Sequence, residues 1–245
     1  MTSVTEHFEE LKKQVEGGIL YLVSTPIGHR GDLSPRALAV ISAVDVVAAE
    51  DTRHTGSLLA SLDMSRPLTS YHEHNKERAT VGLLRALQEG ESVAMVSDAG
   101  TPGLSDPGFF LVRAAVNAGV TVTAVPGPSA LLAALAVSGL PTDAFTFTGF
   151  LPVKKGRRRK ALTALADFPH TLIFYESPHR IISTLTEMAD IYDNRWACVC
   201  RELTKKFEEV KRGRLADLAN FYETSKARGE FTVVVAGAQY DGTLQ

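Results

Sequence analysis

The segment Ala-Glu-Asp-Thr-Arg-His carries side chains that could exchange a proton with a substrate. Glu50 and Asp51 are carboxylates, and Arg53 is a permanent cation. A carboxylate beside a hydroxyl can act as a general base, and a nearby cation can stabilise the anion that forms. The same residues also suit a structural role, because Asp51 could cap a helix starting near Thr52 and pair with Arg53. Both interpretations stay open.

A second polar segment, Tyr-His-Glu-His-Asn, contains His72, Glu73 and His74. The two histidines would share one face of an extended segment, but a third metal ligand is missing. We therefore expect them to contact a substrate or lie on the surface. Cys198 and Cys200 form a lone C-x-C with no further ligands nearby, which indicates a reducing compartment. The sequence predicts no metal site.

Three loops rich in glycine and proline follow three predicted strands. Their sequences are STPIGHRGD, SDAGTPGLSDPG and VPGPSA. Glycine lets backbone approach a ligand and proline fixes the loop, so such loops offer a rigid surface of main-chain N–H and C=O groups. Ordinary turn chemistry would explain any one of them, but it explains three poorly. Because ligands bind beyond the carboxyl ends of strands in α/β sheets, the loops predict a ligand site.

A basic run stands out in a chain whose formal net charge is -2. Its cations are Lys154, Lys155, Arg157, Arg158, Arg159 and Lys160. A solvated helix face is the simplest interpretation of such a run. Its place at a predicted domain boundary favours a basic loop that binds RNA phosphates beside a ligand cleft. We expect the nearby Phe145, Phe147 and Phe150 to pack in the core.

The elements that position these residues alternate between strand and helix. Strands are predicted over 19–23, 44–49, 92–97 and 120–125, and helices over 52–62, 75–88, 109–117 and 129–137, with another helix after the N-cap Ser34. This alternation predicts a parallel sheet. From Pro141 onward, strands TLIFYE, WACVC and EFTVVVAG, a charged strand over 207–210 and helices over 178–191 and 215–225 predict a mixed sheet. The predicted divisions are 1–17 as an N-terminal extension, 18–141 and 142–238 as domains, and 239–245 as a tail.

Several function classes are disfavoured by missing patterns. The sequence has no G-x-G-x-x-G, G-x-x-x-x-G-K-[ST], H-E-x-x-H or G-x-S-x-G, which argues against a Rossmann dehydrogenase, a P-loop NTPase, a zincin and an α/β-hydrolase. No apolar run approaches the ~20 residues of a membrane span, and the first residues are not a signal peptide. We therefore expect a cytoplasmic protein with no membrane partner.

Seven strings in order resemble the tetrapyrrole methylase superfamily. They are VSTPIG, AEDTRHT, SDAGTPGLSDPG, PGPSA, GFLP, FYESPHR and RELTK. The resemblance implies an α/β fold of two domains. The N-terminal domain has a mostly parallel sheet, the C-terminal α/β domain has a mixed sheet, and the cofactor cleft lies between them. It further implies S-adenosyl-L-methionine as cofactor and a homodimer. The strings are most similar to a branch that methylates the ribose 2'-hydroxyl of a cytidine in the decoding region of 16S rRNA, so 16S rRNA or the small ribosomal subunit is the implied partner.

The resemblance also implies which residues hold the cofactor. They are Pro26, Asp98, Ala99, Gly100, Thr101, Leu104, Ser129, Ala130, Tyr175, Glu176, Leu203 and Thr204. Two alternatives stay open, a tetrapyrrole (precorrin-like) C-methyltransferase and a non-catalytic ribosome assembly factor. The basic run argues against the first, because a porphyrinoid with a few carboxylates does not need six clustered cations, and the intact loops argue against the second.

Overall fold

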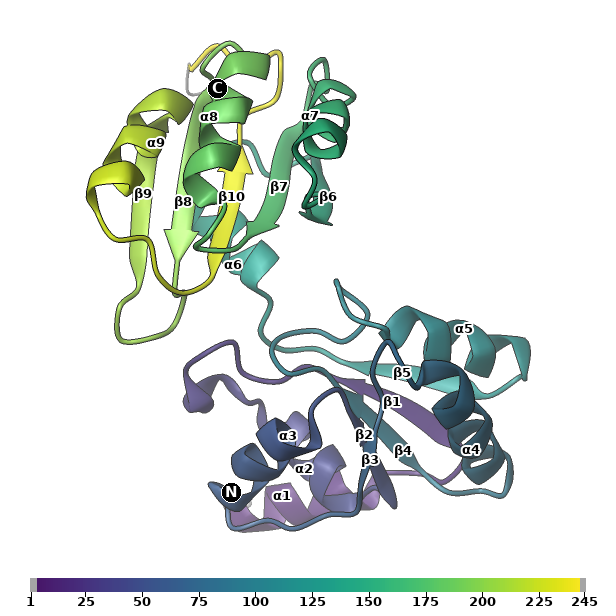
Figure 1. Ribbon diagram of the computed structural model, residues 1–245. Coiled ribbons are helices and arrows are strands. Elements are labelled where there is room, and N and C mark those ends of the chain that lie inside the picture. Colours follow the sequence, from purple (N-terminus) through teal and green to yellow (C-terminus); the bar gives the residue numbers. More distant parts are fainter. Residues whose placement is uncertain (1–3, 243–245) are drawn as a thin grey trace. The chain divides into compact units, whose positions relative to one another are not determined.

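The chain folds into two compact units, Met1–Ser129 and Ala130–Gln245 (Figure 1). The computed structural model describes residues 4–242, so the last part of the predicted 239–245 tail, like the first residues of the predicted extension, lies outside the described residues. We expected the division near Thr142. It falls earlier because the helix that starts at Ala130 packs on the second sheet.

Unit 1 is built on a parallel five-stranded sheet, as predicted. Its strands are β1 (Ile19–Val23), β2 (Val46–Ala49), β3 (Leu68–Ser70), β4 (Val93–Val96) and β5 (Thr121–Val125), in the order β3-β2-β4-β1-β5. Its helices are α1 (Val4–Lys13), the 3-10 helix η1 (Arg30–Asp32), α2 (Pro35–Ala43), α3 (Thr52–Ala60), α4 (Lys76–Gln88) and α5 (Gly108–Asn117). Neither α1 nor β3 was predicted from the sequence.

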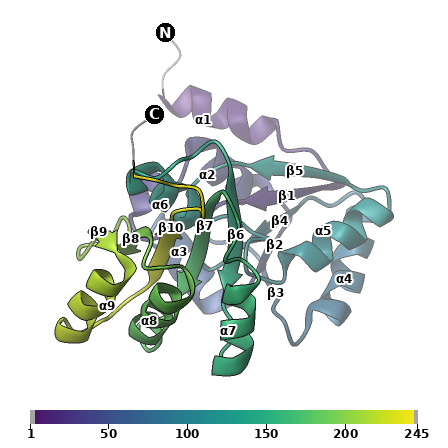
Figure 2. The ribbon, with the colours of Figure 1, turned by 90° about the horizontal axis from the view of Figure 1, so that it is seen from above.

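Helices cover both faces of this sheet, which explains its apolar strands. Ile41 of α2 and Leu59 of α3 pack against one face, while Leu83 of α4 and Leu111 of α5 pack against the other. Figure 2 shows α4 and α5 next to each other. A strand buried on both faces reads as a continuous apolar run, as all of β4 does. The Oγ atom of Ser34 accepts a hydrogen bond from the N–H of Ala37, which confirms the predicted N-cap of α2.

Unit 2 contains the predicted mixed sheet. Its strands are β6 (Phe145–Phe150), β7 (Thr171–Glu176), β8 (Trp196–Arg201), β9 (Glu209–Arg214) and β10 (Phe231–Val235), in the order β6-β7-β10-β8-β9. Its helices are α6 (Ala130–Ser138), α7 (Lys155–Thr163), α8 (Ile181–Ile191) and α9 (Leu215–Thr224). β6 and β7 are parallel, whereas β10 runs antiparallel to β7 and β8, and β9 antiparallel to β8.

Two apolar clusters hold unit 2 together on opposite faces of its sheet. Leu185 of α8 and Leu218 of α9 pack with Phe174 on one face, and Leu131 and Leu135 of α6 pack on the other. The packing of α6 is what shifts the boundary between the units. Within residues 4–242 the structure contains no helix with the length and apolarity needed to cross a membrane.

The basic run forms helix α7 and is not the loop that we expected. Lysine and arginine are good helix formers, so local propensity agrees with this outcome. Arg158 and Leu162 are spaced one turn apart and are the buried residues of the helix. Burial of Leu162 in the core therefore anchors the helix despite its high charge.

Candidate functional site

The three glycine- and proline-rich loops of unit 1 meet at one edge of its sheet, as predicted. They follow β1, β4 and β5, which lie side by side with parallel directions. The N–H of Thr25 donates to the carbonyl of Gly100 at 2.9 Å, and the N–H of Gly100 donates back to the carbonyl of Thr25 at 3.0 Å. This bridge ties the first loop to the second by main-chain atoms alone.

Side chains tie the third loop to the other two. The Oγ atom of Ser24 donates to Oγ1 of Thr101 at 3.1 Å, and Oγ1 of Thr101 donates to the carbonyl of Pro128 at 3.2 Å. Next to Pro128, the hydroxyl of Ser129 is buried and has no hydrogen-bond partner among the described residues. A buried hydroxyl without a partner is costly, so this atom suits a polar ligand at the loops.

The second loop is held in a conformation that needs glycine. Gly100 has a φ of +83°, which L side chains rarely adopt. Further along the loop, the carboxylate of Asp106 accepts hydrogen bonds from the N–H groups of Gly103, at 2.9 Å, and Gly108, at 2.7 Å. These bonds fix the backbone of the loop where α5 begins, so the loop is preformed.

The structure brings the unit 1 residues of the expected cofactor site together. Pro26 lies on the first loop, Ser129 ends the third, and the second carries the remaining five: Asp98, Ala99, Gly100, Thr101 and Leu104. The Oδ1 atom of Asp98 accepts a hydrogen bond from the N–H of Asp51 at 3.0 Å. Asp98 therefore also joins the ends of β4 and β2.

Glu50 is the candidate proton acceptor of unit 1. Burial raises the pKa of its carboxyl group, and the nearby carboxylates of Asp98 and Asp106 raise it further. Near this side chain, Nδ1 of His72 is buried without a hydrogen-bond partner among the described residues. A carboxylate with a raised pKa is better matched to accepting a proton near neutral pH than an ordinary one.

Asp51 and Arg53 adopt the structural arrangement that the sequence left open. Asp51 is the N-cap of α3, where Oδ1 accepts hydrogen bonds from the N–H groups of Arg53 and His54. Its Oδ2 also pairs with Nη2 of Arg53 at 2.8 Å. The hydrogen bond from the Arg53 side chain lowers the pKa of Asp51, which makes this carboxylate a weak base. Of the three predicted catalytic residues, Glu50 thus has the environment best suited to the role.

In unit 2, the expected cofactor residues gather at one edge of the mixed sheet. Glu176 of β7 and Arg201 of β8 both pair with Phe231, so these strands end at the same edge. The side chains of Tyr175 and Leu203 pack against the cluster that contains α6, the helix that Ala130 begins. Leu131, in the first turn of α6, belongs to the same cluster.

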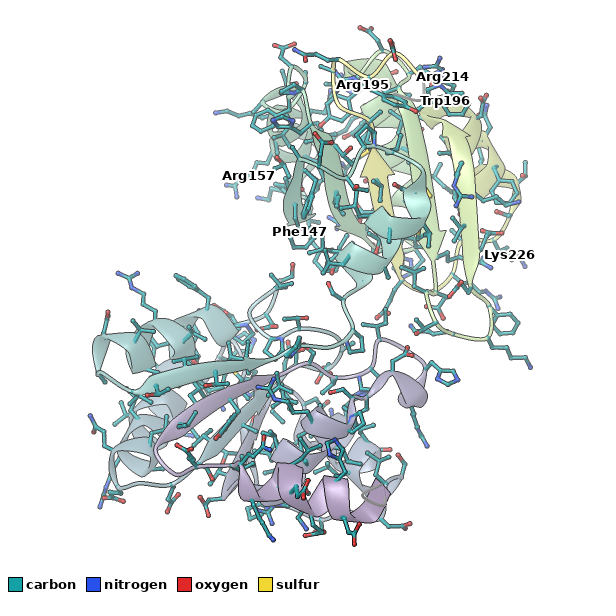
Figure 3. All side chains as sticks on the ribbon, turned by 180° about the vertical axis from the view of Figure 1, so that it is seen from behind. Phe147, Arg157, Arg195, Trp196, Arg214 and Lys226 are labelled. Carbon is teal, nitrogen blue, oxygen red and sulfur yellow. The ribbon has the colours of Figure 1, made fainter. Side chains whose placement is uncertain are left out.

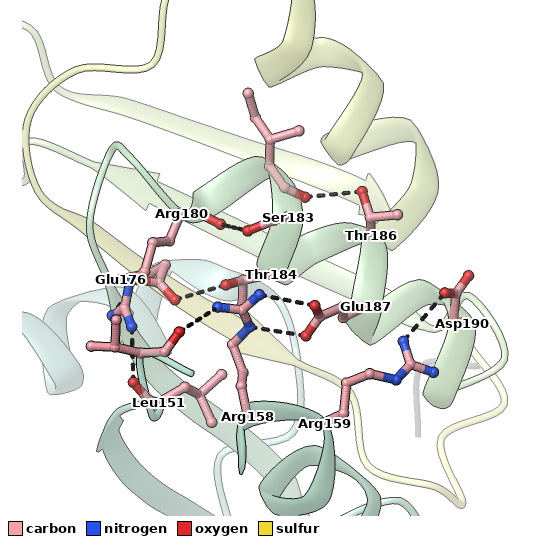
Figure 4. A network of polar contacts seen from close by, with 12 residues as sticks. Leu151, Arg158, Arg159, Glu176, Arg180, Ser183, Thr184, Thr186, Glu187 and Asp190 are labelled. Carbon is pink, nitrogen blue, oxygen red and sulfur yellow. Dashed lines mark hydrogen bonds and ion pairs between the residues drawn. The ribbon is translucent and has the colours of Figure 1, made fainter. Parts of the chain in front are cut away.

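The Glu176 carboxylate is occupied by neighbouring residues of unit 2. It accepts a hydrogen bond from the N–H of Ser177 at 2.7 Å and another from Oγ1 of Thr184 at 2.8 Å, and it pairs with Arg180 at 2.7 Å (Figure 4). Only the backbone of Glu176 therefore remains suited to a ligand. Thr204 has a φ of +65°, so the turn after β8 has an uncommon backbone conformation.

Two cations of the basic run are held in ion pairs with α8, which the sequence did not predict. Arg158 is buried and makes two hydrogen bonds to Glu187, at 2.9 Å and 2.8 Å (Figure 4). Arg159 pairs with Asp190 at 3.6 Å. The expected RNA contact by Arg158 is wrong because its guanidinium lies inside unit 2. Lys154, Lys155, Arg157 and Lys160 are exposed.

The described residues contain no group of three or more His, Cys, Asp or Glu side chains arranged to hold a metal ion. The rings of His72 and His74 lie 5.9 Å apart between centroids and meet edge to face. Cys198 and Cys200 are buried and free, with 3.8 Å between their sulfur atoms. His72 is half-buried and His74 is exposed, whereas both cysteines lie in the core of unit 2.

Sequence reasoning missed three residues that hold the site in shape. Ser24 and Asp106 bond to the loops of unit 1, and Arg180 bonds to the end of β7 in unit 2. Each lies inside one of the strings that were singled out. A polar residue within a glycine-rich loop indicates a role in holding that loop. The sequence does not show which group the residue bonds to, because that depends on the fold.

The sequence pattern of the family Tetrapyrrole (Corrin/Porphyrin) Methylases matches residues 19–219. A curated relative named ribosomal RNA small subunit methyltransferase I, from Xylella fastidiosa (strain Temecula1), is 54% identical over 90% of this chain and 82% of its own length. The protein of the same name from Synechocystis sp. is 49% identical over 90% of this chain and 80% of its own.

Solved structures share the fold. The cobalt precorrin-4 methyltransferase structure gives a TM-score of 0.67 at 20% identity and covers 91% of this chain and 96% of its own. Uroporphyrin-III C-methyltransferase from Thermus thermophilus, complexed with S-adenosylhomocysteine, gives 0.62 at 21% identity, covering 89% and 97%. At these identities the likeness shows the fold alone. Together with the close sequence relatives, these matches show that the chain belongs to the tetrapyrrole (corrin/porphyrin) methylase family and, within it, to the ribosomal RNA small subunit methyltransferases I.

Proposed function

We propose that the chain is an S-adenosyl-L-methionine-dependent methyltransferase that methylates the ribose 2'-hydroxyl of a cytidine in the decoding region of 16S rRNA. The observation that carries the proposal is the identity of 54% with a relative named ribosomal RNA small subunit methyltransferase I, which spans 82% of that relative. The preformed loops of unit 1 support it, because they offer a ligand site where this fold class binds ligands.

The residues of the three loops fit the cofactor. The unpartnered Ser129 hydroxyl supplies a polar group that needs a partner, and Gly100 removes a side chain from the second loop. The loops also offer main-chain carbonyls, which suit a cationic sulfonium. In unit 2, the expected cofactor residues Tyr175 and Leu203 are half-buried and pack beside α6. When bound, the cofactor supplies an electrophilic methyl group.

Two tasks remain for the protein's own residues. The first is to align the ribose oxygen with the methyl group, and positioning of this kind supplies much of the acceleration in group transfer. The second is to accept the hydroxyl proton. We assign this task to Glu50, because burial and the neighbouring Asp98 and Asp106 raise the pKa of its carboxyl group. Asp51 and Arg53 shape the start of α3 beside it.

RNA binding is assigned to the exposed cations of the basic run, Lys154, Lys155, Arg157 and Lys160. Arg159, which is half-exposed beside Asp190, can add a weaker contact. Figure 3 shows Arg157 pointing outward from unit 2. We further propose that the enzyme acts in the cytoplasm, where its substrate is assembled, and that it does so as a homodimer, as the family resemblance implies.

The test uses purified protein, S-adenosyl-L-methionine carrying a labelled methyl group, and small ribosomal subunits that lack the modification. Nuclease digestion and mass spectrometry then locate any 2'-O-methyl nucleoside. We expect one 2'-O-methylcytidine in the decoding region. Absence of transfer to subunits and to free rRNA, with cofactor binding measured separately, would refute the proposed acceptor, and a tetrapyrrole would then be tried in its place.

A further inference from the structure

Phe150, at the end of the edge strand β6, is an exposed aromatic residue next to the basic helix. Its side chain is 57% exposed, although we expected it in the core. A register shift between Phe147 and Gly149 places Phe150 on the same face of the sheet as Phe147, since both rings contact Tyr175. Phe147 is half-buried and packs against the cluster around α6, in line with the expected core position. Phe145, at 41% exposed, and Phe150 do not lie in the core, so the expectation was wrong for these two.

The chain that follows Phe150 is pinned by two arginines. Nη1 of Arg180 donates to the carbonyl of Leu151 at 3.0 Å, and Nη1 of Arg158 donates to the carbonyl of Val153 at 3.4 Å (Figure 4). Both guanidinium groups are themselves held by buried carboxylates of the same unit. The segment 150–157, named here the basic corner, is therefore fixed before any ligand binds.

The basic corner places positive charge close to the exposed ring of Phe150. Lys154, Lys155 and Arg157 are exposed and form no ion pair within residues 4–242. Lys154 is four residues from Phe150, so even an extended chain would separate their Cα atoms by at most about 14 Å. An aromatic ring with adjacent cations suits a nucleic acid strand, since the ring can stack on a base while the cations contact phosphates.

We propose that the basic corner binds single-stranded RNA, with one unpaired base stacked on Phe150 and the flanking phosphates on Lys154, Lys155 and Arg157. The occupant is a single strand because a base within a duplex cannot present its face to the ring. The inference rests on the proposed function and deepens it by specifying the form of RNA that is bound. Arg158 and Arg180 act as positioning residues for this surface.

The test measures binding of a single-stranded RNA oligonucleotide with the decoding-region sequence, and of a duplex of equal length. For Phe150→Ala we expect affinity for the single strand to fall about tenfold, within the range of base–aromatic stacking, with little change for the duplex. Phe150→Trp should retain wild-type affinity. Phe145→Ala is the matched control, because Phe145 is 41% exposed at the other end of the same strand.

Salt dependence separates stacking from charge. For Arg157→Gln we expect the slope of log affinity against log salt concentration to become less steep by roughly 0.7, the contribution of one phosphate contact on a single strand. Phe150→Ala should leave the slope unchanged, because a stacked ring releases no counterions. A change of slope in Phe150→Ala, or equal affinity losses in Phe150→Ala and Phe145→Ala, would overturn the stacking role.

Failure of this inference can be told apart from failure of the proposed function. Wild-type protein that methylates subunits, combined with Phe150→Ala that binds the single strand as tightly as wild type, would refute the basic corner alone. Wild-type protein that neither binds the RNA nor methylates subunits would refute the proposed function. Urea unfolding of each variant verifies that the exposed substitutions leave unit 2 folded.

Discussion

The substitutions Arg158→Ala and Arg159→Ala remove neighbouring cations of the same helix, and we expect very different effects on stability. The side chains of Arg158 and Glu187 are 7% and 6% exposed and share two hydrogen bonds. Removing one partner of a buried pair leaves the other charge uncompensated and costs about 3–5 kcal/mol. Arg159 and Asp190 are 43% and 61% exposed and lie 3.6 Å apart, so their pair is worth about 0–1 kcal/mol.

Urea unfolding followed by circular dichroism measures both effects. A loss of about 3–5 kcal/mol is a large part of the ~5–15 kcal/mol that typically stabilises a domain, so Arg158→Ala should lower the unfolding midpoint of unit 2 strongly. The double variant Arg158→Met with Glu187→Leu should recover much of the loss, because apolar residues of similar size can replace a buried pair. The reasoning is refuted if Arg158→Ala costs no more than Arg159→Ala.

The pH dependence of the same pair has a definite sign. The hydrogen bonds from Arg158 lower the pKa of the Glu187 carboxyl group below its usual value. The stabilisation by the pair is therefore present above the pKa of the unfolded chain, and it is lost as pH falls through the lowered pKa of the folded state. As pH falls from neutral to acidic, the difference in unfolding free energy between wild type and Arg158→Ala should therefore shrink.

Glu50→Gln should abolish most methylation. It should also raise the free energy of unfolding at neutral pH, because the raised pKa of Glu50 means that its charge opposes folding there. This gain in stability should vanish as pH falls below the ordinary pKa range of a carboxyl group. Activity assays and urea unfolding at two pH values test this, with the exposed Glu73→Gln as control. Gly100→Ala and Gly90→Ala should each cost about 1–2 kcal/mol, because both positions have positive φ. Only Gly100→Ala should weaken S-adenosyl-L-methionine binding in calorimetry, and equal binding by the two variants would contradict the role of the loop.

Local patterns predicted most of the fold. The apolar runs of unit 1 gave its strands within a few residues, and Ser34 followed by Pro35 marked the start of α2. The strand β3 was missed because Leu68–Ser70 is too short to show a period. The boundary between the units was placed too late because an alanine- and leucine-rich helix such as α6 does not indicate which sheet it packs against.

The part of the candidate site that is formed by backbone could be predicted from the sequence. Glycines and prolines marked the three loops, and their meeting follows from the strand order of a parallel sheet. The roles of charged residues were harder to predict because they depend on partners distant in sequence. Arg158 looks like its neighbours in the basic run, and only the packing of α7 on α8 identifies it as the buried one. Likewise, the capping role of Asp51 was not decided by the sequence. It depends on the positions of the Arg53 and His54 N–H groups in the folded chain.

The two edges of the mixed sheet differ in how well they resist pairing with another molecule. β9, EVKRGR, is an edge strand in which four of the six residues are charged, which discourages further strand addition. β6, FTFTGF, is an edge strand that is aromatic and uncharged, a composition prone to aggregation. Its register shift and the cations that follow it are the features that oppose self-association. Substitutions that neutralise those cations should therefore also lower the solubility of the protein and the yield of its refolding.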